Sequence, residues 1–385
     1  MLITLSAVFL FLNQSKAQSA FDSLKIKMAK HYFQTVIVMD GYRKPNQEIK
    51  DTSNISKRLK SYGVNQFIFS LNTPIATIDR FSKDSSIRKN THILLTANYM
   101  RLQPVFDGIP THNLVKLGIG GRMIINTGKK AVWFIDVSPF VTKDVTYPSA
   151  PYFRMASTIV YSHNVNDRFN WRIGITKSFL WGNRYYLPFI GLRFGRLDKT
   201  NISIQFPRSI NINLPVNRKL QFSIYTKPQG GMFNFSNHDS IYFFPDSKTF
   251  HFTRYEINTG FRADVRVNSW FNFYIATGFS TKNNITFYSE RANPSKSASG
   301  YRVYFYDKDF APTMFFNAGL VLKFGKTRSF YNDKNLYDAI DLNNTIGGGD
   351  NNISNGNTQI LIPSKQKQQE YNLKSVQDLI DYNDF

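Results

Sequence analysis

The chain has 385 residues, contains no cysteine, and carries 48 Lys and Arg against 26 Asp and Glu. The lack of cysteine excludes disulfide bonds, thiolate nucleophiles and thiolate metal sites. The net charge of +22 favours polyanionic partners such as anionic lipid head groups or the solutes of a cationic pore. We find no helix-turn-helix, aromatic-glycine RNA motif or zinc pattern, so no nucleic-acid partner is expected.

The N-terminal segment is typical of a signal peptide. Residues 2–12 form an apolar core of secretory length, and Ser15 and Ala17 supply the small residues of a cleavage site before Gln18. We therefore assign 1–17 to a signal peptide. No Lys or Arg precedes the apolar core, so a buried first strand or helix is the alternative.

Apolar and polar residues alternate with period two in run after run, with turn signals between the runs. The predicted strands are 32–41, 65–72, 91–102, 113–125, 131–141, 152–163, 169–180, 187–195, 201–206, 209–214, 218–226, 253–267, 270–281 and 313–325. A membrane strand needs about 9–11 residues, and a membrane barrel escapes hydropathy tests because its lumen face is polar. The pattern predicts an all-β fold, a transmembrane antiparallel up-and-down barrel of about 14 strands, spanning residues 30–325. Because two of the strands are very short, a barrel of about 12 strands is the alternative.

The connections between the predicted strands alternate in kind. One set is short and rich in Asn, Asp and Gly, which tolerate the positive φ of tight hairpins: 126–129, 165–168, 197–199, 216–218 and 267–269. Most of the other set is longer: 42–64, 103–112, 142–151, 227–252 and 282–312. Bacterial outer-membrane barrels have short periplasmic turns and long extracellular loops. The alternation therefore predicts the outer membrane of a Gram-negative cell, although 73–90 would be a long periplasmic connection.

The clearest hairpin joins residues 254–267 to 270–280. Its first strand has an apolar face and a charged face, and we predict a lumen-facing charged row made of Arg254, Glu256, Arg262, Asp264 and Arg266. On the lipid face, an Arg at the bilayer midplane would cost about 2–4 kcal/mol. The row either attracts anions in a water-filled pore or forms an ionic network that fills the barrel, and the network is the favoured interpretation.

The last predicted strand resembles the β-signal by which the outer-membrane insertion machinery recognises final strands. The signal has a polar residue, a glycine two positions later, and alternate hydrophobic residues that end in an aromatic. The matching residues are Asn317, Gly319, Leu322 and Phe324. We therefore expect the barrel insertion machinery to be a partner.

The residues after this strand differ in composition. Around 346–352 the tail is rich in Gly and Asn and has little apolar surface to bury, which predicts a mostly disordered periplasmic tail over 326–385. Apolar residues at helical spacing predict a short amphipathic helix at 372–382, where a periplasmic partner of the tail would bind.

A family resemblance rests on three segments, Tyr185–Leu192, Ile202–Ser209 and Asn217–Leu220. Together they resemble an uncharacterised family of bacterial outer-membrane barrel proteins, the domain of unknown function 6268, found notably in Bacteroidetes-type bacteria. The similarity is clearest over 150–325 and consists of strand and turn patterns. It implies an outer-membrane barrel and no functional residues. The net charge of +22 favours outer-membrane lipid and lipopolysaccharide as the partners of such a barrel.

We find no catalytic, cofactor-binding or metal-binding motif and expect no enzymatic activity. Hydrolysis needs a nucleophile, a base and an orienting group in contact, and the six histidines lie outside any such motif. His251 near Ser247 is the one faint candidate for an outer-membrane lipid hydrolase. The sequence therefore predicts an integral, porin-like outer-membrane barrel that acts as a passive pore for small, anionic solutes. The alternative is a structural or adhesion barrel that presents 227–252 and 282–312 to extracellular partners.

Overall fold

The computed structural model describes most of the chain between residues 26 and 324. The described ranges are 26–28, 35–48, 61–81, 88–107, 111–127, 130–147, 150–166, 168–179, 184–196, 199–217, 219–236, 249–268, 270–291 and 301–324. The predicted signal peptide and the predicted tail with its helix lie outside these ranges. Among the residues so described, no helix combines the length and the apolar character needed to cross a bilayer.

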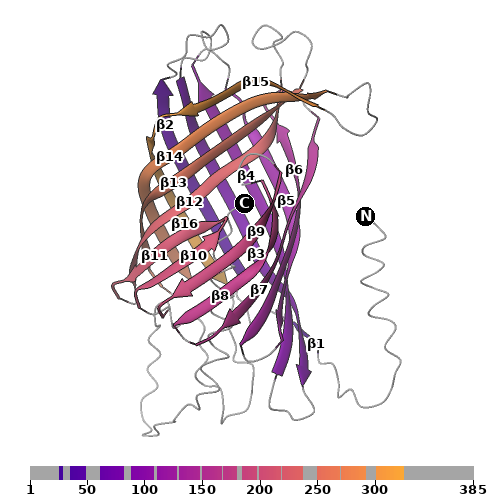
Figure 1. Ribbon diagram of the computed structural model, residues 1–385, viewed down its shortest axis with the longest axis vertical. Helices are drawn as coiled ribbons and strands as arrows, with labels where there is room; N and C mark the ends of the chain where they lie inside the picture. The colour runs from indigo at the N-terminus through magenta and orange to yellow at the C-terminus, as the bar shows by residue number, and fades with distance from the viewer. Residues whose placement is uncertain are drawn as a thin grey trace, which may run out of the picture.

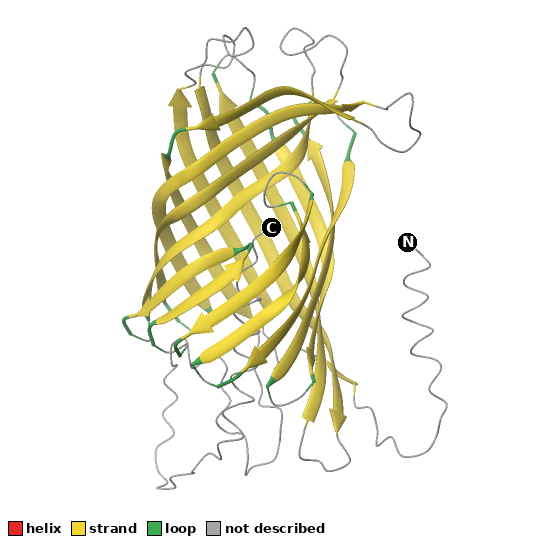
Figure 2. Cartoon of the chain, viewed as in Figure 1, coloured by secondary structure: helices red, strands yellow, loops and turns green. Residues whose placement is uncertain are grey.

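Strands account for nearly all of the described residues (Figure 2). They are β1 (Ile26–Met28), β2 (Thr35–Glu48), β3 (Ser61–Phe81), β4 (Arg88–Phe106), β5 (Leu114–Asn126), β6 (Ala131–Asp144), β7 (Tyr152–Asn164), β8 (Phe169–Ser178), β9 (Tyr185–Phe194), β10 (Asn201–Phe206), β11 (Ser209–Pro215), β12 (Leu220–Ser236), β13 (Thr249–Arg266), β14 (Phe271–Arg291), β15 (Tyr301–Phe310) and β16 (Thr313–Phe324).

Fourteen of these sixteen strands close into one antiparallel barrel (Figure 1). From β2 to β14 each strand pairs with the next one in sequence, and β16 pairs with both β14 and β2 to close the ring. The other two strands, β1 and β15, pair with β3 and β14 outside the ring. The predicted up-and-down barrel with 14 strands is confirmed. The alternative with about 12 strands is wrong, because the two short segments form the separate strands β10 and β11.

Several segments predicted as connections are strands in the structure. β2 and β3 take up part of 42–64, and β3 and β4 run through most of 73–90 as a paired hairpin. β12 and β13 occupy much of 227–252, and β14 with β15 occupies most of 282–312. The predicted long periplasmic connection is therefore an extended hairpin. Alternation weakens in these strand ends because neither face has to meet lipid there.

Successive residues of the barrel strands point alternately to the lumen and to the outside. In β5 the outward residues Leu117 and Ile119 are 53% and 59% exposed, whereas Gly118 and Arg122 are buried. Large apolar side chains are exposed in the same way on most barrel strands, among them Ile173 and Phe261. An apolar surface of this extent suits lipid rather than water, so the barrel is of the transmembrane type.

The wall of the barrel is uneven in height. We call the end of the barrel with short turns, such as 267–270, the turn end, and the opposite end the loop end. β3 and β14 each have 21 residues, whereas β10 and β11 have 6 and 7. In Figure 1, β10 and β11 end well below the loop-end rim that the other strands form. We call β8–β11 the low wall.

Aromatic side chains fill the lumen at the loop end. The ring centre of Phe106 on β4 lies 6.5 Å from that of Phe252 on β13 and 5.9 Å from that of Phe287 on β14. Tyr62 stacks on Phe106 at 5.2 Å. Because β3, β2, β16 and β14 separate β4 from β13 in the sheet, the contact between β4 and β13 crosses the lumen. We call Tyr62, Phe106, Phe252 and Phe287 the aromatic plug.

Above the low wall, β12 lies close to β5 and β6. The last pair that joins β11 to β12 is Ile210 with Thr226, and the rest of β12 continues toward the loop end on β13. Arg154 Nη1 on β7 donates to the carbonyl oxygen of Met232, at 2.8 Å, and to Thr142 Oγ1 on β6, also at 2.8 Å. The Arg154 side chain therefore links β7 and β6 to β12 above the low wall.

Candidate functional site

Two residues of the predicted charged row lie in a buried cluster beside the aromatic plug. Glu256 has no exposed surface. Its carboxylate accepts hydrogen bonds from Tyr42 Oη at 2.8 Å and from Lys44 Nζ at 3.0 Å, and it also pairs with Arg254. The sequence analysis missed Tyr42 and Lys44, which are more than 200 positions away from Glu256, at separations of 214 and 212.

Gln66 extends this cluster across the lumen. Its side-chain oxygen accepts a hydrogen bond from Arg254 Nη1 at 2.9 Å and another from Gln229 Nε2 at 3.2 Å. The acceptor lies on β3, and the two donors lie on β13 and β12 on the far side of the ring. Together with the aromatic plug, these bonds join β3 and β4 to β12 and β13 across the lumen.

The other residues of the predicted row lie nearer the turn end. Arg262 pairs with Asp264 at 2.6 Å, and its guanidinium lies 3.8 Å from the ring centre of Tyr274. The Tyr274 hydroxyl in turn donates to the Asp40 carboxylate at 2.6 Å. Arg266 Nε donates to a backbone carbonyl of the adjoining turn at 3.2 Å. The five predicted residues are thus divided between the buried pair of Arg254 and Glu256 and the pair of Arg262 and Asp264. The fifth, Arg266, contacts the turn.

The four residues of the predicted insertion signal all lie on β16. Asn317 is buried, and Phe324 is outward and 46% exposed. Gly319 lies under the ring of Tyr274, and a Cβ atom at this position would overlap that ring. Lack of a side chain at Gly319 therefore allows Tyr274 to reach across β16 to Asp40 on β2.

This geometry predicts that Gly319→Val destabilises the folded barrel, whether or not the residue is also read during insertion. Overpacking of this kind costs about 1–3 kcal/mol, here by displacing the Tyr274 ring from Asp40. Urea unfolding of refolded protein in detergent, where no insertion machinery is present, measures the cost. Asn317→Ala is the matched variant of the same strand without a ring above it. If Gly319→Val is as stable as the unchanged chain, the close packing of Tyr274 over Gly319 does not contribute to stability.

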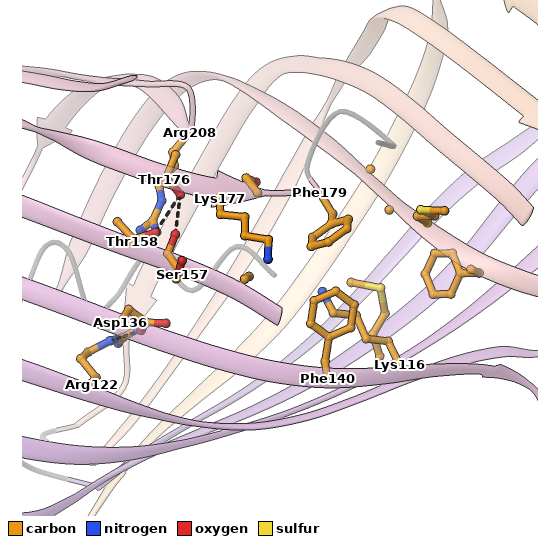
Figure 3. Close-up of a pocket in the computed structure, with 17 residues that line it drawn as sticks. Lys116, Arg122, Asp136, Phe140, Ser157, Thr158, Thr176, Lys177, Phe179 and Arg208 are labelled. Carbon is orange, nitrogen blue, oxygen red and sulfur yellow. Dashed lines mark hydrogen bonds and ion pairs between the residues drawn. The ribbon is translucent and has the colours of Figure 1, made fainter. Parts of the chain in front are cut away.

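A cleft lies where the low wall ends. It is lined by residues of β4 to β8, the β10–β11 turn and β12, and the space among these residues is about 770 Å³ when open solvent is included. Four cations line it, Lys116, Arg122, Lys177 and Arg208, against the single carboxylate of Asp136. We call this the cationic cleft. In Figure 3, Lys116 and Lys177 reach toward its centre from different strands.

The carboxylate of Asp136 is already engaged within the wall of the cleft. One oxygen accepts from Arg122 Nε at 2.8 Å, and the other accepts from Ser138 Oγ at 2.7 Å. Among the residues that line the cleft, four side chains are therefore cationic and one is a carboxylate. An anion is the ligand that such a site attracts.

Neutral groups hold two of these cations in place. Lys116 Nζ lies 4.3 Å from the ring centre of Phe140, and Arg208 Nη2 donates to Thr158 Oγ1 at 3.1 Å. The alternation of β5 places Lys116 on the lumen face, but the sequence analysis did not single out Lys177 or Arg208. The available signal is the two-residue connection 207–208 between strands too short to cross a bilayer.

His251 contacts other groups than those a hydrolase needs. Its Nδ1 lies 3.1 Å from Asn234 Oδ1, and its ring packs against Tyr152 and Tyr288. Ser247, its proposed partner, lies outside the described residues. Within the described ranges, no group of three or more His, Asp or Glu residues is placed to hold a metal ion.

Comparisons with solved structures find other barrels at low similarity. The translocator domain of the autotransporter NalP from Neisseria meningitidis matches with a TM-score of 0.29 and 11% identity, over 84% of this chain and 97% of that one. A Pseudomonas aeruginosa FadL homologue matches with a TM-score of 0.26 and 9% identity, over 76% and 90%. Superpositions this poor carry no argument about function.

Comparison with curated proteins finds no match. A family profile does match, over residues 143–323, which run from the end of β6 to the last strand. This range includes the low wall and the segments on which the resemblance in the sequence rests. The matching profile, over residues 143–323, is that of the family described as Domain of unknown function (DUF6268), which is the family that the sequence resembles.

Proposed function

We propose that the chain is an integral barrel of the bacterial outer membrane that conducts small anionic solutes through the cationic cleft. The outward apolar surface supports the membrane location. The observation that carries the proposal is the excess of positive charge in the cleft, where Lys116, Lys177 and Arg208 outnumber the engaged Asp136. Since the rings of the aromatic plug meet across the lumen, the proposed route runs beside the plug rather than through it.

Planar-bilayer recording of the refolded mature chain tests this function. We expect small current steps whose reversal potential under a salt gradient shows selectivity for anions. Lys116→Gln should lower that selectivity, because the side chain faces the cleft over Phe140. Lys143→Gln is the matched control, since Lys143 is an exposed lysine on the outward face of β6. Cation-selective steps, or equal effects of the two variants, would refute the proposal.

A second candidate function is a barrel that presents its loop end to partners outside the cell. The observation that favours it is the β14–β15 hairpin, which continues β14 beyond its pairing with β16 and lies outside the closed ring (Figure 1). Complete absence of current, in the unchanged chain and in a variant without the plug residue Phe252, would favour this candidate over the pore.

A further inference from the structure

The β10–β11 turn lies at a depth where a barrel wall normally continues. β10 has 6 residues, which span about 20 Å along a strand, and a tilted crossing needs about 9–11 residues. The residues on either side of the turn, Phe206 and Ile210, point outward and are 42% and 49% exposed. Apolar side chains exposed on both flanks suit a lipid environment around Pro207 and Arg208.

Irregular backbone at membrane depth is tolerated only where it is buried in protein or lines a water-filled cavity. Pro207 is buried, and Arg208 turns inward, away from the lipid. Its guanidinium donates to Thr158 (Figure 3). It also lies 5.7 Å from the ring centre of Phe189. The turn thus forms the edge of the cationic cleft on the side of the low wall.

The cleft also passes around the loop end of β8, where its pairing with β7 ends at Ser157 and Lys177. Thr158 and Thr176 face the lumen, and their neighbours Ser157 and Lys177 occupy outward positions, yet all four line the cleft. Lys177 shares its outward face with Ile175, which is 54% exposed. A cation on the lipid face costs about 2–4 kcal/mol at the midplane. In Figure 3 the Lys177 side chain bends toward the cleft instead.

We propose that the cationic cleft opens sideways over the low wall and binds the anionic head group of a membrane amphiphile. The head group, a carboxylate or a phosphate, lies between Lys177, Arg208 and Lys116. Its acyl chain remains in the bilayer along the outward faces of Phe206 and Ile210. This inference specifies the class of ligand that the proposed pore would carry. A role of the site in transport rests on the proposed function.

Stearate with a nitroxide near its carboxylate, added to the full mature chain in phosphatidylcholine nanodiscs, tests the inference by electron spin resonance. We expect an immobilised spectral component with the acid but not with its uncharged methyl ester. Lys177→Gln combined with Arg208→Gln should weaken binding about tenfold, the effect of losing charge-assisted hydrogen bonds. Lys143→Gln should bind as the unchanged chain does.

Two further competition experiments distinguish a lipid-derived anion from a soluble one. Lysophosphatidate should displace the labelled acid, whereas inorganic phosphate should not; displacement by inorganic phosphate would show a soluble ligand and overturn the inference. The charge-preserving pair Lys177→Arg with Arg208→Lys should keep most of the binding, and a gel shift on heating checks that each variant is folded. Equal immobilisation of acid and ester would also overturn it.

The outcome also separates this inference from the proposed function. Anion-selective currents without an immobilised probe would support the proposed pore and refute the proposed binding of a lipid head group. An immobilised probe without currents would support the head-group site and refute the proposed pore.

Discussion

Replacing Glu256 with glutamine is expected to destabilise the barrel by about 3–5 kcal/mol, the usual result of removing one partner from a buried ion pair. Glu256 has no exposed surface, and its loss would leave Lys44 and Arg254 buried without a counter-charge. Urea unfolding of the refolded chain, followed by tryptophan fluorescence and by the heat-dependent gel shift, measures the effect.

Asp264→Asn is the matched control for this prediction. Asp264 also pairs with an arginine of β13, but its side chain is 31% exposed and that of Arg262 is 32% exposed. Water screens such a pair, so its loss should cost only about 0–1 kcal/mol. Adding Lys44→Met to Glu256→Gln should recover part of the stability, because it removes one of the uncompensated charges. Equal costs for Glu256→Gln and Asp264→Asn would contradict the structural role of the buried cluster.

Phe252→Ala is expected to open the lumen at the aromatic plug and to raise the conductance of inserted barrels. Phe252 is fully buried and packs against Phe287 at 5.1 Å between ring centres and against Phe106. Its truncation leaves a cavity and costs about 3–5 kcal/mol of stability. In a lumen that already holds polar groups at Gln66 and Arg254, water would enter that cavity.

Single-channel recording checks the expected increase, with Phe279→Ala as the control. Phe279 is a phenylalanine of the next strand that points outward and is 56% exposed, so its truncation changes the lipid face and not the lumen. Conductance should rise in Phe252→Ala and stay at the unchanged value in Phe279→Ala. If Phe252→Ala conducts no more than the control, the plug does not limit passage.

Local alternation made the strands of this barrel predictable. Residues such as Leu117 and Ile119 must face lipid while Gly118 and Arg122 face the lumen, and this requirement is met one residue at a time along the chain. The fourteen predicted segments therefore coincide with the fourteen barrel strands. Short turns between neighbours then set the order of pairing, because each strand pairs with the next one.

The ends of the strands were harder to predict for a physical reason. In β14 the lower part, up to Ser280, alternates clearly and pairs with β16, but the part that pairs with β15 contains Asn283 and Asn284 together. Where a strand leaves the bilayer, neither face is required to be apolar, so the period-two signal fades although the hydrogen-bonded ladder continues. Prediction by alternation therefore mistook the extended hairpins for loops.

The sequence by itself determined which side of each strand meets lipid, since that choice depends on the transfer of single side chains between lipid and water. Only the tertiary structure decided what fills the lumen and where the wall is low. Lys44 meets Glu256 and Gln66 meets Gln229 because ring closure brings distant strands face to face. The cationic cleft likewise gathers residues from β5, β8 and the β10–β11 turn. Such contacts depend on the curvature of the whole sheet, which no short stretch of residues specifies.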